Sequence, residues 1–205
     1  MVFDPFDDSM ESRRKAASAK RALIGAGILG IDWVVFHPVH IPYADHDMLL
    51  HKNMDWLRPF ADLAGENNTG IAVENMNDYG KLTRYCCIAD DLCELIDTMD
   101  MQNVGICWDI GHAHCQKIDQ YFEILKIGHR LKVLHVQDND GISDGHTAPY
   151  YGSVNWNIIK KALDDILYKG NFTFEAHMLI RLVPDDCKDH AATLLYKIGE
   201  HICGM

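Results

Sequence analysis

Four short apolar runs in this chain each end on a residue that can bind a metal ion. These terminal residues are Glu74, Asp109, His135 and Glu175. If the runs are neighbouring strands of a parallel sheet, their last side chains converge at its carboxyl edge, where barrel enzymes keep their chemistry. Three carboxylates and an imidazole gathered there would concentrate negative charge unless a cation bound among them. Oxygen ligands with one nitrogen suit Mn²⁺, Mg²⁺, Co²⁺ or Zn²⁺, so the sequence predicts a divalent-metal centre.

Each of these residues also has an ordinary structural alternative. An isolated carboxylate at a strand end can cap the next helix or pair with a basic neighbour. A lone histidine in a loop is more often solvated than bound to a metal. Four such residues in register favour the metal site over this alternative.

A second set of possible metal ligands lies around the same strand ends. His37 ends an earlier apolar run, and His112 lies three residues beyond Asp109. Asp144 and His146 form an Asp-x-His pair in a long polar loop. We include these four residues as further possible ligands, with surface or hydrogen-bonding roles as the alternative.

Strands and helices alternate along the chain in the order that would position these residues. A helix is expected from about Met10 to Gly27, begun by a capping box of Asp8 and Glu11. A second helical stretch covers residues 45–64, where Pro59 should kink or divide it. Five strands are expected, at residues 31–36, 71–74, 104–109, 131–135 and 172–175.

This order predicts an α/β fold, a (β/α) barrel of the TIM type that is incomplete. A full eight-stranded barrel typically needs about 250 residues, whereas this chain has 205 and opens on a helix. We therefore expect a single barrel domain over residues 1–205 that lacks its N-terminal strands. An open α/β sheet is the alternative, but four consecutive ligands converge better on a curved sheet.

Composition limits the possible function classes. The 48 % hydrophobic content suffices for a sizeable core, and no apolar stretch is long enough to span a membrane. The net charge of −11 disfavours a surface that grips nucleic acid. Seven cysteines without a C-x-x-C pair, and no signal-peptide pattern at the N-terminus, indicate a reducing cytoplasm.

Other residues near the strand ends have simpler expected roles. Trp108 should pack in the core, although it could also line a substrate pocket next to Asp109. Lys132, inside a strand, should form a salt bridge at the end of the barrel. Asp138 and Asn139 should shape the loop that follows them.

An ordered set of motifs resembles the xylose isomerase-like TIM-barrel superfamily. The resemblance is to its branch of sugar-phosphate isomerase/epimerases and endonuclease IV-like enzymes (AP endonuclease family 2), over roughly residue 22 to the C-terminus. What is absent is the family's beginning, its first strands. The motifs that carry the resemblance are Glu74–Met76, Trp108–His114, His135–Asn139, Asp144–His146, Gly152–Trp156 and Glu175.

The resemblance implies a metal-dependent isomerase or epimerase that acts on a sugar or sugar phosphate. In such enzymes a proton α to a carbonyl is moved through a metal-stabilised enediolate. Glu74, Asp109, His135 and Glu175 would form the core metal site. Glu74 and Glu175 would exchange the proton from opposite faces of the substrate, and His112 would contact the substrate.

Two alternatives stay open. One is a zinc-dependent apurinic/apyrimidinic endonuclease-like phosphodiesterase, in which His37, His112, Asp144 and His146 would help to hold a cluster of zinc ions. The other is a truncated barrel that binds metal but has lost turnover.

The expected partners follow from the same observations. The substrate is a small carbohydrate, and the chain is expected to bind neither nucleic acid nor a membrane. Bare sheet edges invite pairing with another chain, so we expect a homodimer or a higher homo-oligomer. Its interface should involve the first helix with Leu23 and Ile28, residues 31–36 and residues 172–174.

Overall fold

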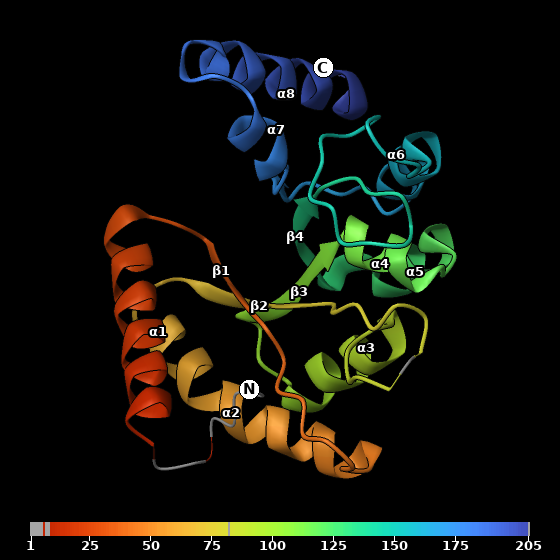
Figure 1. Cartoon of the computed structure of the whole chain (residues 1–205). Coiled ribbons are helices and arrows are strands. Elements are labelled where there is room, and N and C mark those ends of the chain that lie inside the picture. Colours follow the sequence, from red (N-terminus) through yellow and green to blue (C-terminus); the bar gives the residue numbers. More distant parts are fainter. Residues whose placement is uncertain (1–5, 7–8, 82, 205) are drawn as a thin grey trace.

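Five parallel strands, joined in chain order, form a single sheet through the middle of the molecule, with helices around it (Figure 1). The computed structural model describes residue 6 and residues 9–81 and 83–204. The predicted incomplete α/β barrel is confirmed, because the sheet is curled and open. The strands are β1 (Trp33–Phe36), β2 (Gly70–Glu74), β3 (Val104–Asp109), β4 (Leu131–Val136) and β5 (Asn171–Phe174).

Helices connect the parallel strands, as crossover connections require. Helix α1 precedes the sheet and α8 follows it, and none of the described helices is long and apolar enough to cross a membrane. The helices are α1 (Met10–Leu29), α2 (His46–Glu66), α3 (Ala89–Met99), α4 (Ile110–Gln116), α5 (Gln120–Ile127), α6 (Trp156–Asp165), α7 (His177–Leu182) and α8 (Lys188–Cys203), with short 3₁₀ turns at Gly128–Arg130 and Asp185–Cys187.

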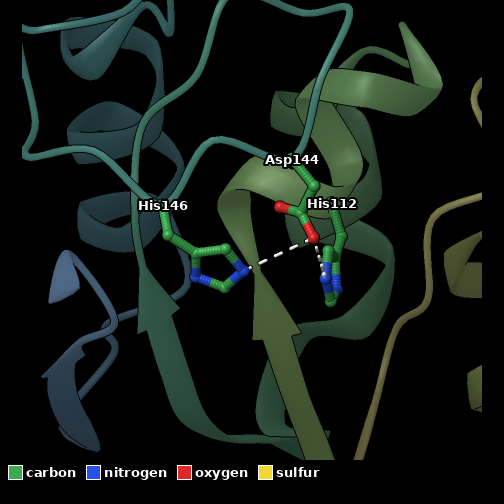
Figure 2. Close-up of side chains that lie close together, drawn as sticks. All are labelled: His112, Asp144 and His146. Atoms are coloured by element: carbon green, nitrogen blue, oxygen red, sulfur yellow. Dashed lines mark ion pairs between the residues drawn. The ribbon is translucent and has the colours of Figure 1, made fainter. Parts of the chain in front are cut away.

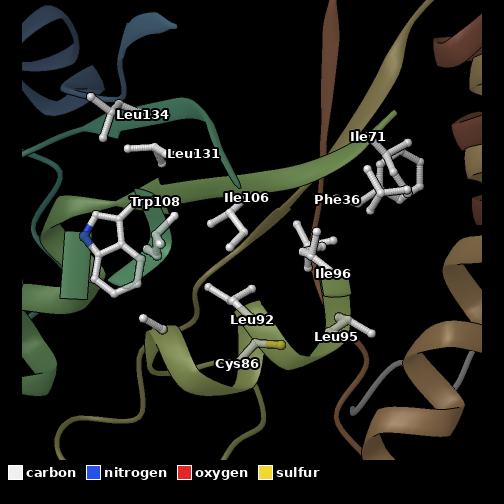
Figure 3. Close-up of a cluster of buried hydrophobic side chains, with 14 of the residues drawn as sticks. Phe36, Ile71, Cys86, Leu92, Leu95, Ile96, Ile106, Trp108, Leu131 and Leu134 are labelled. Atoms are coloured by element: carbon white, nitrogen blue, oxygen red, sulfur yellow. The ribbon is translucent and has the colours of Figure 1, made fainter. Parts of the chain in front are cut away.

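The main core lies between the sheet and the helices. Ile106 of β3 and Leu92 of α3 point toward each other there (Figure 3). Trp108 is fully buried in the same cluster, so it packs in the core and does not wall a pocket. Burying one large apolar side chain contributes about 1.5–3 kcal/mol, and this layer holds the strand ends in place.

The sheet is curled enough that side chains of β1 and β4 come together on its other face. The Lys132 ammonium lies 5.6 Å from the centre of the Trp33 ring. Gly70 and Gly105 leave room for these side chains, because a Cβ at either glycine would overlap Trp33 or Lys132 respectively. Lys132 donates to the carbonyl of His129 at 2.9 Å and makes no ion pair with a described residue, so its predicted salt bridge is wrong.

Helix α1 begins at Met10, as predicted, and ends beyond the predicted Gly27. Ser9 caps its start by accepting from the backbone N–H of Ser12, while the predicted capping residue Asp8 lies outside the described residues. The helix runs on to Leu29 and ends at Gly30, whose φ is 68°. Close packing explains Gly27, since a Cβ there would overlap Asn67 at the end of α2.

Helix α2 continues through Pro59 without a break, so the proline does not divide it, and a kink there stays a prediction. The expected place of Leu23 in a subunit interface is wrong. Leu23 is fully buried within its own chain and therefore cannot lie in a subunit interface. Ile28, in contrast, is 80 % exposed.

Candidate metal centre

The carboxyl ends of four strands bring together the four residues predicted as the core site. Glu74 ends β2, Asp109 ends β3, His135 lies near the end of β4, and Glu175 directly follows β5. One ligating atom from each lies within 4.8 Å of the others. His135 Nδ1 is 2.9 Å from Glu74 Oε1 and 3.4 Å from Glu175 Oε1.

The donor set fits a divalent cation. Asp109 is fully buried; its Oδ1 accepts the backbone N–H of His112 at 2.7 Å. Its other oxygen, Oδ2, is buried and has no hydrogen-bond partner in the described part of the chain; His112 Nδ1 lies 3.8 Å from it. A buried carboxylate oxygen without a partner is costly. A cation held by Asp109 and the other three residues would satisfy that oxygen.

Burial and the histidines shift the pKa values of the two innermost carboxylates in opposite directions. Burial raises the pKa of Glu74, but hydrogen bonds from His135 and His37 outweigh it and lower the pKa to about 2. Burial raises the pKa of Asp109 to about 6, although His112 lies close to it. Glu74 is therefore a carboxylate at neutral pH. Ionised Asp109, in contrast, lowers the free energy of unfolding, because burial disfavours its charge.

A second cluster of possible ligands lies beside the first. Asp144 is placed between two imidazoles, with its Oδ2 3.2 Å from His112 Nε2 and 3.4 Å from His146 Nε2 (Figure 2). The structure thus brings these three predicted residues together as a separate group. Burial raises the pKa of Asp144, but hydrogen bonds from the two histidines outweigh it and lower it well below its usual range.

The two clusters adjoin each other through the histidines. His112 Nδ1 is 3.7 Å from Glu74 Oε1, and His146 Nδ1 is 3.8 Å from Glu175 Oε2. His112 Nδ1 also lies 2.8 Å from the carbonyl of Asn75. Since a carbonyl only accepts, Nδ1 carries a proton and Nε2 is left to face Asp144. Burial lowers the pKa of His112, but Asp144 and Asp109 outweigh it and raise the pKa to about 9.

His37 lies at the rim of the first cluster. Its Nε2 is 2.9 Å from Glu74 Oε2, and its side chain is 68 % exposed. The structure therefore places His37 next to Glu74, outside the His112–Asp144–His146 group.

The loop that carries Asp144 and His146 is held by a buried carboxylate. Asp138 has no exposed surface and pairs its backbone with Thr147. The predicted role of Asp138 in shaping this loop is confirmed. Four N–H groups donate to its carboxylate, from the backbones of Asn139, Tyr150 and Val154 and from the Trp156 indole.

Sequence reasoning missed three residues at this site. Asn75 exchanges two hydrogen bonds with the backbone of Asp109, and Gln137 donates to Asp144 Oδ1 at 2.6 Å. The His177 ring is 4.5 Å from the ring of His146. In the sequence these residues are marked by their position alone, since each follows a predicted core ligand by one or two residues.

Curated relatives resemble the chain over part of its length. An uncharacterised protein of Methanocaldococcus jannaschii is 28 % identical over 187 residues, which cover 85 % of this chain and 63 % of that protein. D-psicose 3-epimerase of Enterocloster bolteae is 27 % identical over 124 residues, which cover 60 % of this chain and 38 % of the enzyme. The chain spans less than two thirds of the length of either relative.

Solved structures share the fold at lower identity. D-psicose 3-epimerase from Clostridium cellulolyticum H10, solved with D-tagatose, is 17 % identical with a TM-score of 0.73, over 96 % of this chain and 73 % of that one. The IOLI protein, solved with a zinc atom, is 18 % identical with a TM-score of 0.75, over 96 % of this chain and 72 % of that one.

A family model described as a xylose isomerase-like TIM barrel matches residues 3–191. The match covers most of the chain and contains every motif on which the resemblance rests. The chain belongs to the xylose isomerase-like TIM-barrel family.

Proposed function

We propose that this chain is a divalent-metal-dependent isomerase or epimerase of a sugar or sugar phosphate. The observation that carries the proposal is the Glu74–Asp109–His135–Glu175 cluster, in which one buried carboxylate oxygen has no hydrogen-bond partner among the described residues. The relative named D-psicose 3-epimerase and the fold shared with ketose epimerases support the same reaction class. Mn²⁺, Mg²⁺, Co²⁺ and Zn²⁺ all suit these ligands.

The two glutamates are suited to moving a proton. A bound cation would stabilise the negative charge that develops on the substrate oxygens when an α-proton leaves. Glu74 is deprotonated at neutral pH and can accept that proton. Glu175 is 34 % exposed and lies across His135 from Glu74, so it can return a proton from the other side. The His112 ring lies at the border of both clusters, where it can contact the substrate whether or not its Nε2 holds a second cation.

The second cluster favours one alternative. His112, Asp144 and His146 could hold a further cation beside the first, as a zinc-dependent phosphodiesterase acting at abasic sites would need. The net charge of −11 opposes this reading, because a DNA-binding surface usually carries basic groups. We therefore rank the sugar reaction first. A metal-binding barrel without turnover is the third possibility.

The test combines metal content with proton exchange. Purified protein should hold at least one equivalent of divalent metal, and the Glu74→Gln, Glu175→Gln double variant should lose it. Ketoses and their phosphates should then exchange an α-proton with deuterated water when Mn²⁺, Mg²⁺ or Co²⁺ is supplied. Glu200→Gln, which removes a surface carboxylate paired with Lys197, is the matched control and should behave as wild type.

Three other outcomes would change the assignment. Full metal occupancy in the double variant would show that these carboxylates are not the site. Cleavage of abasic-site duplex DNA, abolished by a chelator and by Glu175→Gln and without sugar exchange, would establish the phosphodiesterase. Metal binding without either reaction would favour the barrel that has lost turnover.

A further inference from the structure

Gln137 lies between the two clusters and is fully buried. Its side-chain N–H group donates to Asp144 Oδ1 at 2.6 Å and to Asp109 Oδ1 at 3.4 Å. Its side-chain oxygen accepts the backbone N–H of His146 at 3.2 Å. One neutral amide thus bonds a carboxylate of each cluster and the backbone of a third residue.

The remaining oxygens of both carboxylates are directed elsewhere. Asp109 Oδ2 has no hydrogen-bond partner that the structure describes, and Asp109 belongs to the core cluster. Asp144 Oδ2 lies between His112 and His146. Gln137 therefore holds the Oδ1 atom of each carboxylate, whereas the Oδ2 atom of each stays available for a cation.

The backbone next to Gln137 is shaped for this side chain. A Cβ at Gly111 would overlap the side-chain amide of Gln137, so the start of α4 must carry a glycine there. The amide is also fixed at its other end by the backbone of His146. It cannot move away from one carboxylate without disturbing its bonds to the other cluster.

We propose that Gln137 is a positioning residue that couples two cation sites, one at Glu74–Asp109–His135–Glu175 and one at His112–Asp144–His146. The inference rests on the proposed function for the first site and adds a second cation whose geometry depends on it. Asp109 held by a cation would fix the Gln137 amide, and Gln137 would in turn orient Asp144 toward its two histidines. Hydrogen-bond partners behind metal ligands commonly change metal affinity by about 10- to 100-fold.

The experiment is a Co²⁺ titration of the metal-free full chain, followed by visible absorption and by equilibrium dialysis. Wild type should bind two equivalents. Gln137→Met has a side chain of similar length without the N–H donor, so the second equivalent should bind at least tenfold more weakly and the absorption of the first should shift. Gln137→Asn keeps an amide too short to reach both carboxylates and should weaken the second equivalent in the same way. If Gln137→Met fails to fold, Gln137→Asn gives the test of the second equivalent.

Gln120→Met is the matched control. Gln120 is also a buried glutamine, but its amide contacts Trp108 and Ile110 and no carboxylate. It should lose some thermal stability and keep both Co²⁺ affinities and both spectra. A role of Gln137 in folding alone would give that same pattern and would overturn the coupling.

The outcomes separate this inference from the function on which it rests. Two equivalents bound by wild type and unchanged in both Gln137 variants would overturn the coupling and leave the metal centre intact. A single equivalent in wild type, lost in the Glu74→Gln, Glu175→Gln variant, would also overturn the coupling while supporting the core site. No Co²⁺ binding by wild type would overturn both.

Discussion

At the scale of single residues, Asp109 shows that the metal-free site is maintained at a cost to stability. Folding raises the pKa of its carboxyl from 3.8 to about 6 because the group is buried. The cost of its ionised form is absent below pH 3.8 and complete above about pH 6. A shift of roughly two units corresponds to about 3 kcal/mol.

Asp109→Asn should therefore stabilise the metal-free protein. The amide keeps an oxygen that can cap α4, but it removes the buried charge. Urea denaturation in chelator at pH 8 should show a gain of up to about 3 kcal/mol, which disappears as the pH falls through 6 toward 4. Asp144→Asn should change stability in the opposite direction, because hydrogen bonds from His112 and His146 lower the pKa of Asp144. Loss of stability in Asp109→Asn at pH 8 would contradict this account.

A second residue-scale prediction concerns protons. In the metal-free protein the pKa of His112 is about 9, because Asp144 and Asp109 outweigh the effect of burial. His112 is therefore protonated at pH 7 and must lose a proton when its Nε2 binds a cation. Metal affinity should rise by about tenfold per pH unit for each proton released and level off above about pH 9. Calorimetry in buffers of different ionisation enthalpy counts the protons, and His112→Gln should release one fewer.

At the scale of elements, the alternation of strand and helix could be predicted from the sequence because each strand is a short apolar run. The four residues of the core cluster could be located for the same reason, since each stands where such a run ends. Gln137 and Asn75 were not predictable, because an amide next to a ligand has no distinctive pattern until the opposite carboxylate is placed. The spacing of the two clusters depends on how far the sheet curls, which no run of residues reveals.

The loop after β4 gives the element-scale prediction. Four N–H groups converge on the buried Asp138 carboxylate, so removing it leaves several buried donors unpaired. Asp138→Ala should cost at least about 3 kcal/mol of stability and weaken binding at Asp144 and His146. Asp140→Ala is the matched control, because Asp140 caps the same loop from an exposed position and should cost far less. Equal stability losses in chemical denaturation would contradict the role of Asp138.

At the scale of the whole molecule, the open sheet leaves apolar groups at its margins. β2 and β3 are fully buried, whereas β1 and β5 are only partly covered. Near the β1 edge, Ile28 and Leu29 are 80 % and 75 % exposed. Bare edges and adjacent apolar side chains are features that another chain can cover.

We therefore expect a two-fold homodimer that covers the β1 edge. Light scattering at micromolar concentration should give twice the chain mass of 23.3 kDa. The Ile28→Glu, Leu29→Glu double variant should be monomeric, because a charge cannot be buried there without a partner. Ile142→Glu, at an exposed position in the β4–α6 loop, should leave the dimer intact. A wild-type monomer that does not bind hydrophobic dye would rule the dimer out.

The packing of Trp33 over Gly70, and of Lys132 over Gly105, has an evolutionary consequence. In each pair the large side chain occupies the volume that a side chain on the glycine would need, so the glycine cannot be enlarged while its partner keeps its size. Gly70→Ala should be harmful beside tryptophan, and a smaller residue at position 33 should relieve only part of the harm, because the added Cβ would also lie 2.9 Å from the backbone oxygen of Asn103. Relatives with a larger residue in place of either glycine should have a smaller residue at the partner position or a sheet that is less strongly curled.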